Sequence, residues 1–203
     1  DAAVALEKQL AAKPGDKKIM MNLAAIYMQS NQDAKAGQMF DKMRAAGLLT
    51  ESKDYETGFR LLANIDGREK DAMSLIDEGL KKGVLQPSYD MYAFQGRTYY
   101  EAEDTAKAME AWSKGAPLSK DGEMYLNLAK LRLDANQYAE AKAAALSAKT
   151  KGVKRQGDIY SVLARAEHGL HNAAASKAAL QEATKFSETR KWAEAALRQG
   201  LGD

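Results

Sequence analysis

The sequence predicts an all-α fold, a right-handed solenoid in which antiparallel pairs of helices stack one after another. Three observations predict it: a composition dominated by Ala, Leu, Lys, Glu and Met with only three prolines, small residues that return every 33 to 36 positions, and Gly and Pro placed between the helical segments. A period in the thirties is typical of stacked helical arrays, so it decides the fold class before any single segment does.

The composition excludes several classes of function. Thirty basic and 28 acidic residues leave a formal charge of +2, which gives no reason to expect nucleic acid or an anionic membrane as the partner. The chain has no cysteine, so it has neither a disulfide framework nor a thiolate metal site. No stretch approaches the ~18 consecutive apolar residues of a membrane-spanning helix. We therefore expect no direct membrane span.

Small residues recur at one place in each successive segment. These anchor residues are Ala2, Ala36, Ala72, Ala108, Ala141 and Ser176. Two helices can approach to ~8 Å only where the side chains at their crossing are small. A residue that is apolar in every segment, such as Trp112 after Ala108, follows four positions later. The spacing therefore predicts that each anchor lies at a helix–helix crossing.

Taken in order, the segments predict one domain over residues 1–203. Residues 1–16 are expected to form the second helix of a repeat whose first helix precedes the sequence. Residues 187–199 form an extra amphipathic helix, which would cap the array with a polar outer face. Between them we expect five helical hairpins, at 17–50, 53–86, 89–120, 122–155 and 157–186.

Gly and Pro mark the ends of the predicted hairpins. Pro14, Pro87 and Pro117 fall between units, where a helix must stop. A helix often ends in a left-handed residue, and glycine adopts that conformation without steric cost. We expect such caps where second helices end, at Gly47, Gly83, Gly115 and Gly152.

These residues resemble the tetratricopeptide repeat, whose pattern places large and small residues at set distances along two helices. The clearest repeat shows Tyr92, Gly96, Tyr99, Ala108 and Trp112. The repeat at 17–50 is also clear and shows Leu23, Ala24, Tyr27, Ala36 and Phe40.

Other repeats depart from the pattern. Arg132 and Glu167 stand where a tyrosine is usual, and the repeat at 53–86 keeps only Phe59 and Ala72 as good anchors. The resemblance nevertheless covers nearly the whole chain in several registered copies. It implies a non-catalytic scaffold whose first helices line a concave groove that holds an extended peptide or a partner helix.

The resemblance also implies which residues face the groove. Carried over repeat by repeat, these places are Met21, Met28, Leu61, Asn64, Arg97, Tyr100, Lys130, Leu133 and Arg165. The groove would be apolar at its N-terminal end and basic at its C-terminal end, where it would suit an acidic partner.

Each of these assignments has an alternative. Three basic residues at one repeat position are unremarkable in a chain with 30 basic residues, and an aromatic such as Tyr100 serves packing as often as binding. A different function also stays open, in which the convex face or the exposed first helix drives self-association and assembly.

Catalysis has no support in the sequence. His168 and His171 are the only histidines, and although their spacing could place two imidazoles on one face, no third ligand is evident. There is no nucleophile elbow and no phosphate-binding loop. We therefore expect no enzyme activity, no metal and no cofactor.

Residues 115–199 resemble a narrower group, the tetratricopeptide proteins of proteobacterial TonB-linked energy-transduction systems. The features are "DGE" before a first helix, "KGV" after a second helix, and a Thr-Arg-Lys capping helix. This resemblance implies a periplasmic location and contact with TonB or its motor complex; a cytoplasmic location is the alternative.

Overall fold

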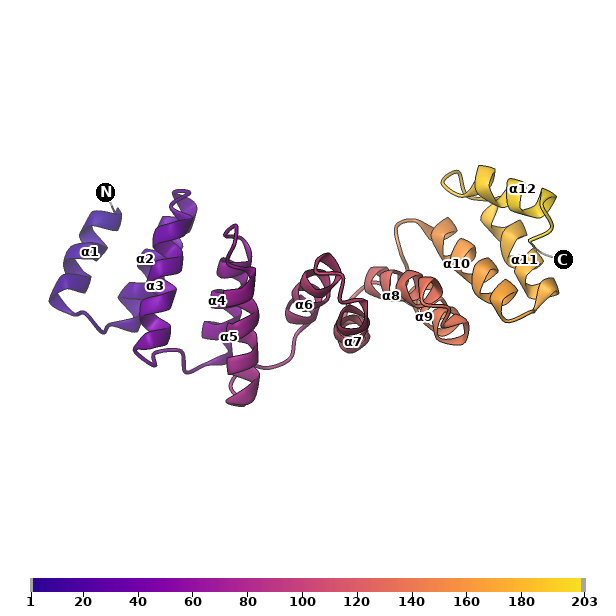
Figure 1. The fold of residues 1–203 in the computed structure, drawn as a ribbon. Coiled ribbons are helices and arrows are strands. Elements are labelled where there is room, and N and C mark those ends of the chain that lie inside the picture. Colours follow the sequence, from indigo (N-terminus) through magenta and orange to yellow (C-terminus); the bar gives the residue numbers. More distant parts are fainter. Residues whose placement is uncertain (1, 202–203) are drawn as a thin grey trace. The chain divides into compact units, whose positions relative to one another are not determined.

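The computed structural model describes residues 2–201 and contains twelve α-helices and one short 3-10 helix in that range (Figure 1). No strand occurs among these residues. The all-α prediction is confirmed. The chain divides into two compact units, Asp1–Pro87 and Ser88–Asp203.

The first unit consists of a single helix followed by two helical hairpins (Figure 1). Consecutive helices pack against each other, and each hairpin pairs two helices of nearly equal length. The helices are α1 (Ala2–Ala12), α2 (Lys17–Gln29), α3 (Asp33–Ala45), α4 (Ser52–Ala63) and α5 (Glu69–Lys81).

The second unit contains three hairpins and a final helix. Within it, α8 contacts α7, α9 and α10, so it is covered on several sides. The elements are α6 (Tyr89–Glu101), α7 (Thr105–Gly115), η1 (Ala116–Leu118), α8 (Glu123–Asp134), α9 (Tyr138–Lys151), α10 (Gln156–Gly169), α11 (Ala173–Ala183) and α12 (Arg190–Arg198).

The predicted anchor residues are buried in every complete hairpin. The buried anchors, each with 0% of its surface exposed, are Ala36, Ala72, Ala108, Ala141 and Ser176. The Ser176 hydroxyl donates to the carbonyl of Ala164, at 3.0 Å, which satisfies a polar group that burial would otherwise destabilise. Ala2 is the exception, because it is exposed and its neighbour Ala3 is buried instead.

Each hairpin turn contains one residue in the left-handed conformation. The five residues are Asn31, Gly67, Glu103, Asn136 and His171, with φ between 55° and 79°. They recur every 33 to 36 positions, as the anchors do. Four of the five are not glycine, although a side chain is strained in this conformation. Their regular placement shows that the hairpins share one turn geometry.

The glycines that end the second helices do not all behave alike. Gly47 and Gly83 both have φ of 68°, in keeping with the predicted left-handed caps. Gly152 also has a positive φ, 84°, but its ψ of 138° lies outside the left-handed helical region. The prediction is wrong for Gly115, where φ is −81° and the chain continues into η1. A Cβ on Gly115 would lie 2.7 Å from Tyr92 Cβ and from Met124 Sδ. Close packing therefore explains this glycine.

Polar contacts join neighbouring hairpins in each unit. In the first unit, Lys17 Nζ on α2 lies 2.5 Å from Asp54 Oδ2 on α4, and Asp54 is only 3% exposed. Burial disfavours the charged carboxylate, but hydrogen bonds from Lys17 and the backbone N–H groups of Glu51 and Thr50 lower the pKa of Asp54. In the second unit, Lys151 Nζ donates to the carbonyls of residues 116, 117 and 119, at 2.6 to 3.2 Å.

The last helix starts later than the amphipathic pattern suggests. Helix α12 begins at Arg190, because residues 187–189 are used in a turn. There the Glu188 carboxylate accepts a hydrogen bond from the backbone N–H of Gly157, at 3.1 Å, and the Thr189 hydroxyl donates to the carbonyl of Ala183. Ala193 and Ala196 then form the buried face of α12.

Candidate functional site

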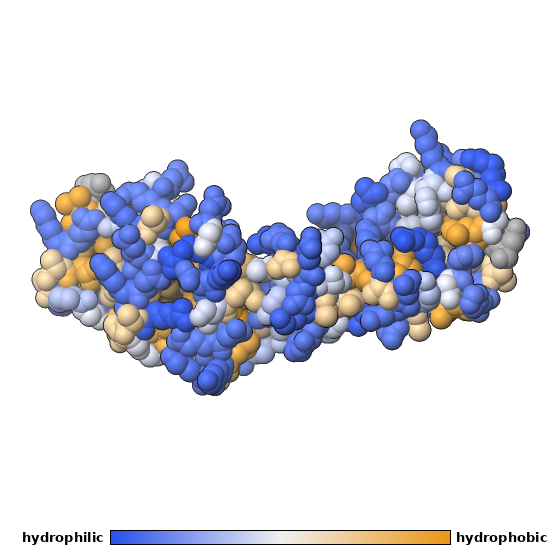
Figure 2. All heavy atoms as spheres, viewed as in Figure 1, coloured by the Kyte–Doolittle hydropathy of each residue, from blue (hydrophilic) through white to orange (hydrophobic). Residues whose placement is uncertain are grey.

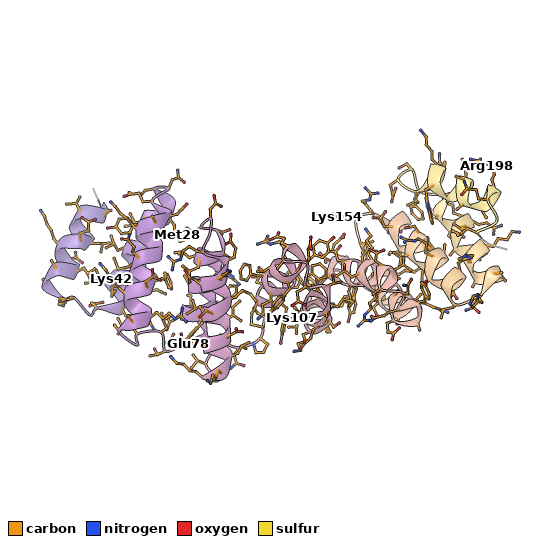
Figure 3. The ribbon with its side chains drawn as sticks, viewed as in Figure 1. Met28, Lys42, Glu78, Lys107, Lys154 and Arg198 are labelled. Carbon is orange, nitrogen blue, oxygen red and sulfur yellow. The ribbon has the colours of Figure 1, made fainter. Side chains whose placement is uncertain are left out.

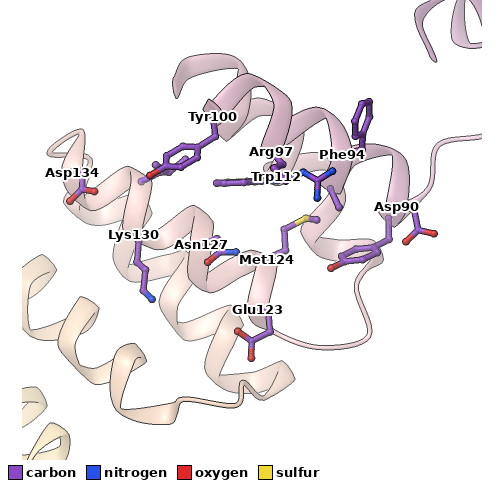
Figure 4. Close-up of a pocket in the computed structure, with 13 residues that line it drawn as sticks. Asp90, Phe94, Arg97, Tyr100, Trp112, Glu123, Met124, Asn127, Lys130 and Asp134 are labelled. Carbon is purple, nitrogen blue, oxygen red and sulfur yellow. The ribbon is translucent and has the colours of Figure 1, made fainter. Parts of the chain in front are cut away.

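A groove of about 720 Å³ lies in the second unit between α6, α7 and α8 (Figure 4). We call it the α6–α8 groove. Trp112 and Met124 lie in its middle, with Tyr100 and Asp134 toward one end and Phe94 and Asp90 toward the other. Aromatic and aliphatic side chains inside a polar rim are what most ligand sites offer.

The aromatic centre of the groove depends on a missing side chain. A Cβ on Gly96 would lie 2.1 Å from Trp112 Nε1, so only glycine lets the indole rest against the backbone of α6. The rings of Trp112 and Tyr100 have centroids 5.9 Å apart and are tilted by 34°. Tyr100 is 52% exposed. The exposed ring of Tyr100 is thus in contact with an indole that packs against the backbone of α6.

Helices α6 and α8 supply the walls of the groove, and each contributes the residues of one helical face. On α6 the lining residues are Tyr89, Asp90, Ala93, Phe94, Arg97 and Tyr100. On α8 they are Glu123, Met124, Asn127, Lys130, Leu131 and Asp134. Both sets follow the spacing of three and four that keeps residues on one helical face. The walls are therefore first helices of consecutive hairpins, the helices that the repeat pattern assigns to the groove.

The three basic residues predicted for the groove, Arg97, Lys130 and Arg165, are each paired with a carboxylate. Lys130 Nζ lies 2.9 Å from Asp158 Oδ2. Arg165 Nη2 lies 3.7 Å from Asp134 Oδ1. Arg97 Nε lies 3.9 Å from Glu101 Oε1. Each cation thus already has an anionic neighbour, so this surface carries less net positive charge than the sequence suggests.

The other predicted groove residues are dispersed. Leu61 is 2% exposed and Leu133 is 4% exposed, so both belong to the core, and the prediction that they face a groove is wrong. Met21 is half-buried on α2 in the first unit. Met28, on the same helix, is 39% exposed, and Figure 3 labels its side chain. Asn64 is exposed, and its amide donates to the carbonyl of Arg60, at 2.8 Å.

Sequence reasoning missed Asn127 and Asp134, which both line the groove. Of the two predicted places on α8, Lys130 lines the groove, whereas Leu133 is one residue away from the lining residue Asp134, because α8 carries leucines on more than one side and is covered by several helices. The polar residues of α8 offered the missing signal. Glu123, Asn127 and Lys130 share one face at helical spacing, and that face lines the groove.

A second groove of about 500 Å³ lies between α10 and α12, and we call it the α10–α12 groove. Arg165 and His168 line it from α10. The other lining residues include Trp192, Ala195, Ala196 and Leu201. Arg165, predicted for one continuous groove, therefore lies here and not with Arg97.

Exposed large hydrophobic side chains are few and are spread over both units. On the face shown in Figure 2, hydrophilic residues cover most of the surface, and hydrophobic residues form small patches between them. Seven large hydrophobic side chains are exposed within residues 2–201, and three of these seven line the two grooves: Tyr89, Tyr100 and Trp192.

Within residues 2–201, no group of three or more His, Cys, Asp or Glu side chains is arranged to hold a metal ion. None of the helices in the same range has the length and apolar character needed to cross a membrane.

No family model and no curated protein matches the sequence. Solved structures do match the fold. YrrB, described as a TPR protein with an unusual peptide-binding site, has a TM-score of 0.71 at 15% identity, over 97% of this chain and 99% of its own. The C-terminal part of a TPR repeat-containing protein from Cytophaga hutchinsonii has a TM-score of 0.60 at 16% identity, over 91% of this chain and 72% of its own.

A third similar structure is PilW, described as a widely conserved type IV pilus biogenesis factor. Its TM-score is 0.55 at 16% identity, over 94% of this chain and 88% of its own. At such identities a structural likeness establishes the fold and leaves the ligand open. The chain therefore has the all-α fold of the tetratricopeptide repeat proteins.

Proposed function

We propose that the chain is a non-catalytic scaffold that binds another protein through an extended peptide or a helix lodged in the α6–α8 groove. One observation carries this proposal: exposed Tyr100 and half-buried Trp112 meet inside a groove of about 720 Å³ between two first helices. Aromatic residues on a rigid support are frequent anchors of protein interfaces. The likeness of the fold to a structure described as having a peptide-binding site adds support.

The chemistry of the rim indicates how a peptide would be held. The Asn127 amide can donate to a backbone carbonyl and accept from a backbone N–H, so it can hold an extended strand of any sequence. The apolar floor of Met124 and Leu131 suits an aliphatic or aromatic side chain. Because Arg97 and Lys130 have carboxylate neighbours, an acidic peptide must compete with them. We therefore expect apolar content to matter more than negative charge.

The proposal is tested by selecting peptides from a phage library of random 12-residue sequences. The enriched peptides are then synthesised and titrated into the protein. Tyr100→Ala should weaken binding by about tenfold or more, as truncation of an interface anchor does. Lys70→Ala, an exposed position on α5 in the other unit, is the matched control and should have no effect. Failure to enrich any peptide, or equal loss in both variants, would contradict the proposal.

The periplasmic location and the TonB partner are also proposals. The resemblance of residues 115–199 supports a periplasmic scaffold beside TonB or its motor complex. Crosslinking in the native host tests it, because the chain should be recovered from the periplasmic fraction and crosslinked to TonB or a motor subunit. Recovery from the cytoplasm alone would reject the periplasmic location. Self-association, the other proposed function, predicts a mass by light scattering that rises with protein concentration.

A further inference from the structure

A small polar pocket of about 110 Å³ lies in the second unit between α6 and α7, and we call it the α6–α7 pocket. None of its described lining residues also lines the α6–α8 groove. A pocket of this size holds a group as large as about three or four water molecules. Its polar lining residues are Tyr92, Gln95, Tyr99, Lys107, Glu110 and Lys114.

Gln95 is a buried polar residue whose carboxamide has no partner in the protein. The residue is only 8% exposed, and within residues 2–201 its carboxamide forms no hydrogen bond. No fully enclosed side-chain nitrogen or oxygen in this range lacks a hydrogen bond, so the carboxamide opens into the pocket. A buried amide without a hydrogen bond destabilises a folded protein. A ligand in the pocket would supply the missing partner.

Packing of the repeat does not explain this glutamine. Gln95 directly precedes the small residue of its first helix, and in three other hairpins that place is taken by a buried leucine: Leu23, Leu128 and Leu163. A leucine here would fill the same space without an unbonded polar group. The glutamine therefore indicates a role other than packing.

The hairpin of α10 and α11 has a pocket at the same repeat positions, of about 210 Å³. Each residue of the α6–α7 pocket has a counterpart there 68 positions later, so Gln95 corresponds to Leu163 and Lys107 to Ala175. The repeat therefore forms this pocket with an apolar lining as well. The polar groups of the α6–α7 pocket are a property of this one hairpin and not a requirement of the fold.

The charges of the α6–α7 pocket favour an anion. Lys107 (labelled in Figure 3) and Lys114 bring two positive charges, against one negative charge from Glu110. Lys107 Nζ lies 2.8 Å from Asp104 Oδ2, and Lys114 Nζ lies 2.7 Å from Glu110 Oε1. Both lysine side chains are more than half exposed, so these pairs are weak. An ammonium group has three donors, so each lysine can keep its carboxylate and also donate to a ligand.

Neutral donors add to the two ammonium groups. The Gln95 amide carries two N–H groups, and the hydroxyls of Tyr92 and Tyr99 form no hydrogen bond with any described residue. Lys107 Nζ lies 5.4 Å from the centroid of the Tyr99 ring, which places this charge beside the phenol. The pocket thus has more donors than acceptors, and it complements a group that is rich in acceptor oxygens.

We propose that the α6–α7 pocket binds a phosphoryl group, either free phosphate or a phosphorylated side chain of a partner. A phosphoryl group presents at least three acceptor oxygens and nearly two negative charges, whereas a carboxylate presents two oxygens and one charge. Lys107 and Lys114 would pair with its charge, and the Gln95 amide would donate to an oxygen at the base of the pocket. This site does not depend on the function of the α6–α8 groove.

NMR spectroscopy tests the proposal directly. The side-chain amide signals of Gln95 in a nitrogen–proton spectrum are the reporter, and their loss in Gln95→Leu assigns them. The probes are inorganic phosphate, acetyl-phosphoserine amide, acetate, and sodium chloride at matched ionic strength. Phosphate should shift the Gln95 signals saturably, with a Kd in the low millimolar range. Acetate should bind at least about tenfold more weakly, and chloride should cause no saturable shift.

The phosphoserine probe distinguishes the two sources of the phosphoryl group. If the pocket serves a phosphorylated partner, acetyl-phosphoserine amide should bind at least as tightly as phosphate. If it serves the free ion, the added peptide atoms should weaken binding. The backbone signal of Ala179, which lines the corresponding pocket of α10 and α11, should not move with either probe.

Substitutions show which groups hold the ligand. Lys107→Gln and Lys114→Gln should each weaken phosphate binding about fivefold or more. Gln95→Leu, followed through the backbone signal of the lining residue Ala111, should weaken it similarly and raise the unfolding temperature, because the unbonded amide is removed. Lys70→Gln on α5 makes the same change of charge at an exposed position and is the control.

Circular dichroism shows that each variant is folded. The proposal would be overturned by the absence of a saturable shift with phosphate, or by equal binding of acetate and phosphate. Undiminished phosphate binding by Gln95→Leu, or equal loss in Lys70→Gln and Lys107→Gln, would overturn it as well.

Discussion

At the scale of single residues, Gly96 links the packing of the fold to the chemistry of the groove. Glycine normally weakens a helix interior by about 0.5–1 kcal/mol relative to alanine. Here it is needed, because the indole of Trp112 occupies the space where a Cβ would be. The indole in turn supports the exposed ring of Tyr100. One absent side chain thus shapes the aromatic floor of the α6–α8 groove.

Gly96→Ala is therefore expected to destabilise the protein, although alanine is the better helix former. The added Cβ would sit 2.1 Å from Trp112 Nε1, and relieving such a clash in a packed site costs about 1–3 kcal/mol. Urea unfolding measures the change. Gly15→Ala, where a Cβ meets nothing within 4 Å, is the control and should be close to neutral. A stabilised Gly96→Ala protein would show that the indole moves aside freely.

At the scale of elements, the hairpin turn is the most regular feature of the chain. One left-handed residue follows each first helix. The residue at this place is Asn in two hairpins and Gly, Glu or His in one hairpin each. Asn and Gly tolerate the left-handed conformation, whereas Glu and His are more strained there. A glycine at this place should therefore stabilise the turns that hold Glu or His more than the turns that hold Asn.

Glu103→Gly should stabilise the protein by about 0.5–1 kcal/mol, because Glu103 has φ of 60° and glycine carries no Cβ penalty there. Asn136→Gly should change stability much less, since asparagine already suits φ of 58°. Ala102→Gly, one position before the strained residue and with φ of −85°, should destabilise. Thermal unfolding of the three variants gives their order of stability. A Glu103→Gly protein that is less stable than the parent would refute the idea that Glu103 is strained.

The elements also show what could be predicted from the sequence. Anchors such as Ala108 could be predicted because a close helix crossing requires a small residue whatever surrounds it. The face that α8 presents was harder to predict, because its leucines lie on more than one side of the helix and a rotation of one residue exchanges Leu133 for Asp134. The pairing of Lys130 with Asp158 joins residues on different helices, so no local pattern could reveal it.

At the scale of the whole molecule, buried and half-buried carboxylates link helices in both units. Asp54 pairs with Lys17, and Glu167 pairs with Lys142. Glu78 on α5 pairs with Arg44 on α3 and also accepts a hydrogen bond from the hydroxyl of Tyr55 on α4. The pKa of each carboxyl is lowered because these partners outweigh the effect of burial. Acid should therefore weaken helix packing in both units at once.

Glu78 offers the sharpest test of this acid sensitivity. Burial raises its pKa, but hydrogen bonds from Lys82, Arg44 and Tyr55 lower it from 4.5 to about 2. A carboxyl whose pKa is lower in the folded protein stabilises the fold at pH above 4.5, and this contribution is lost as the pH falls toward 2. At ~1.4 kcal/mol for each pH unit, and allowing for the partial exposure of Glu78, the contribution is about 2–3 kcal/mol.

Glu78→Gln should thus lower the free energy of unfolding by about 2–3 kcal/mol at pH 7, with the deficit shrinking steadily between pH 4.5 and pH 2. Urea unfolding of parent and variant at several pH values across this range measures the deficit. Glu110→Gln removes the exposed partner of Lys114 and serves as the control, with little change at any pH. A deficit that stays constant as the pH falls would mean that Glu78 stabilises the hairpins through its shape and not through its charge.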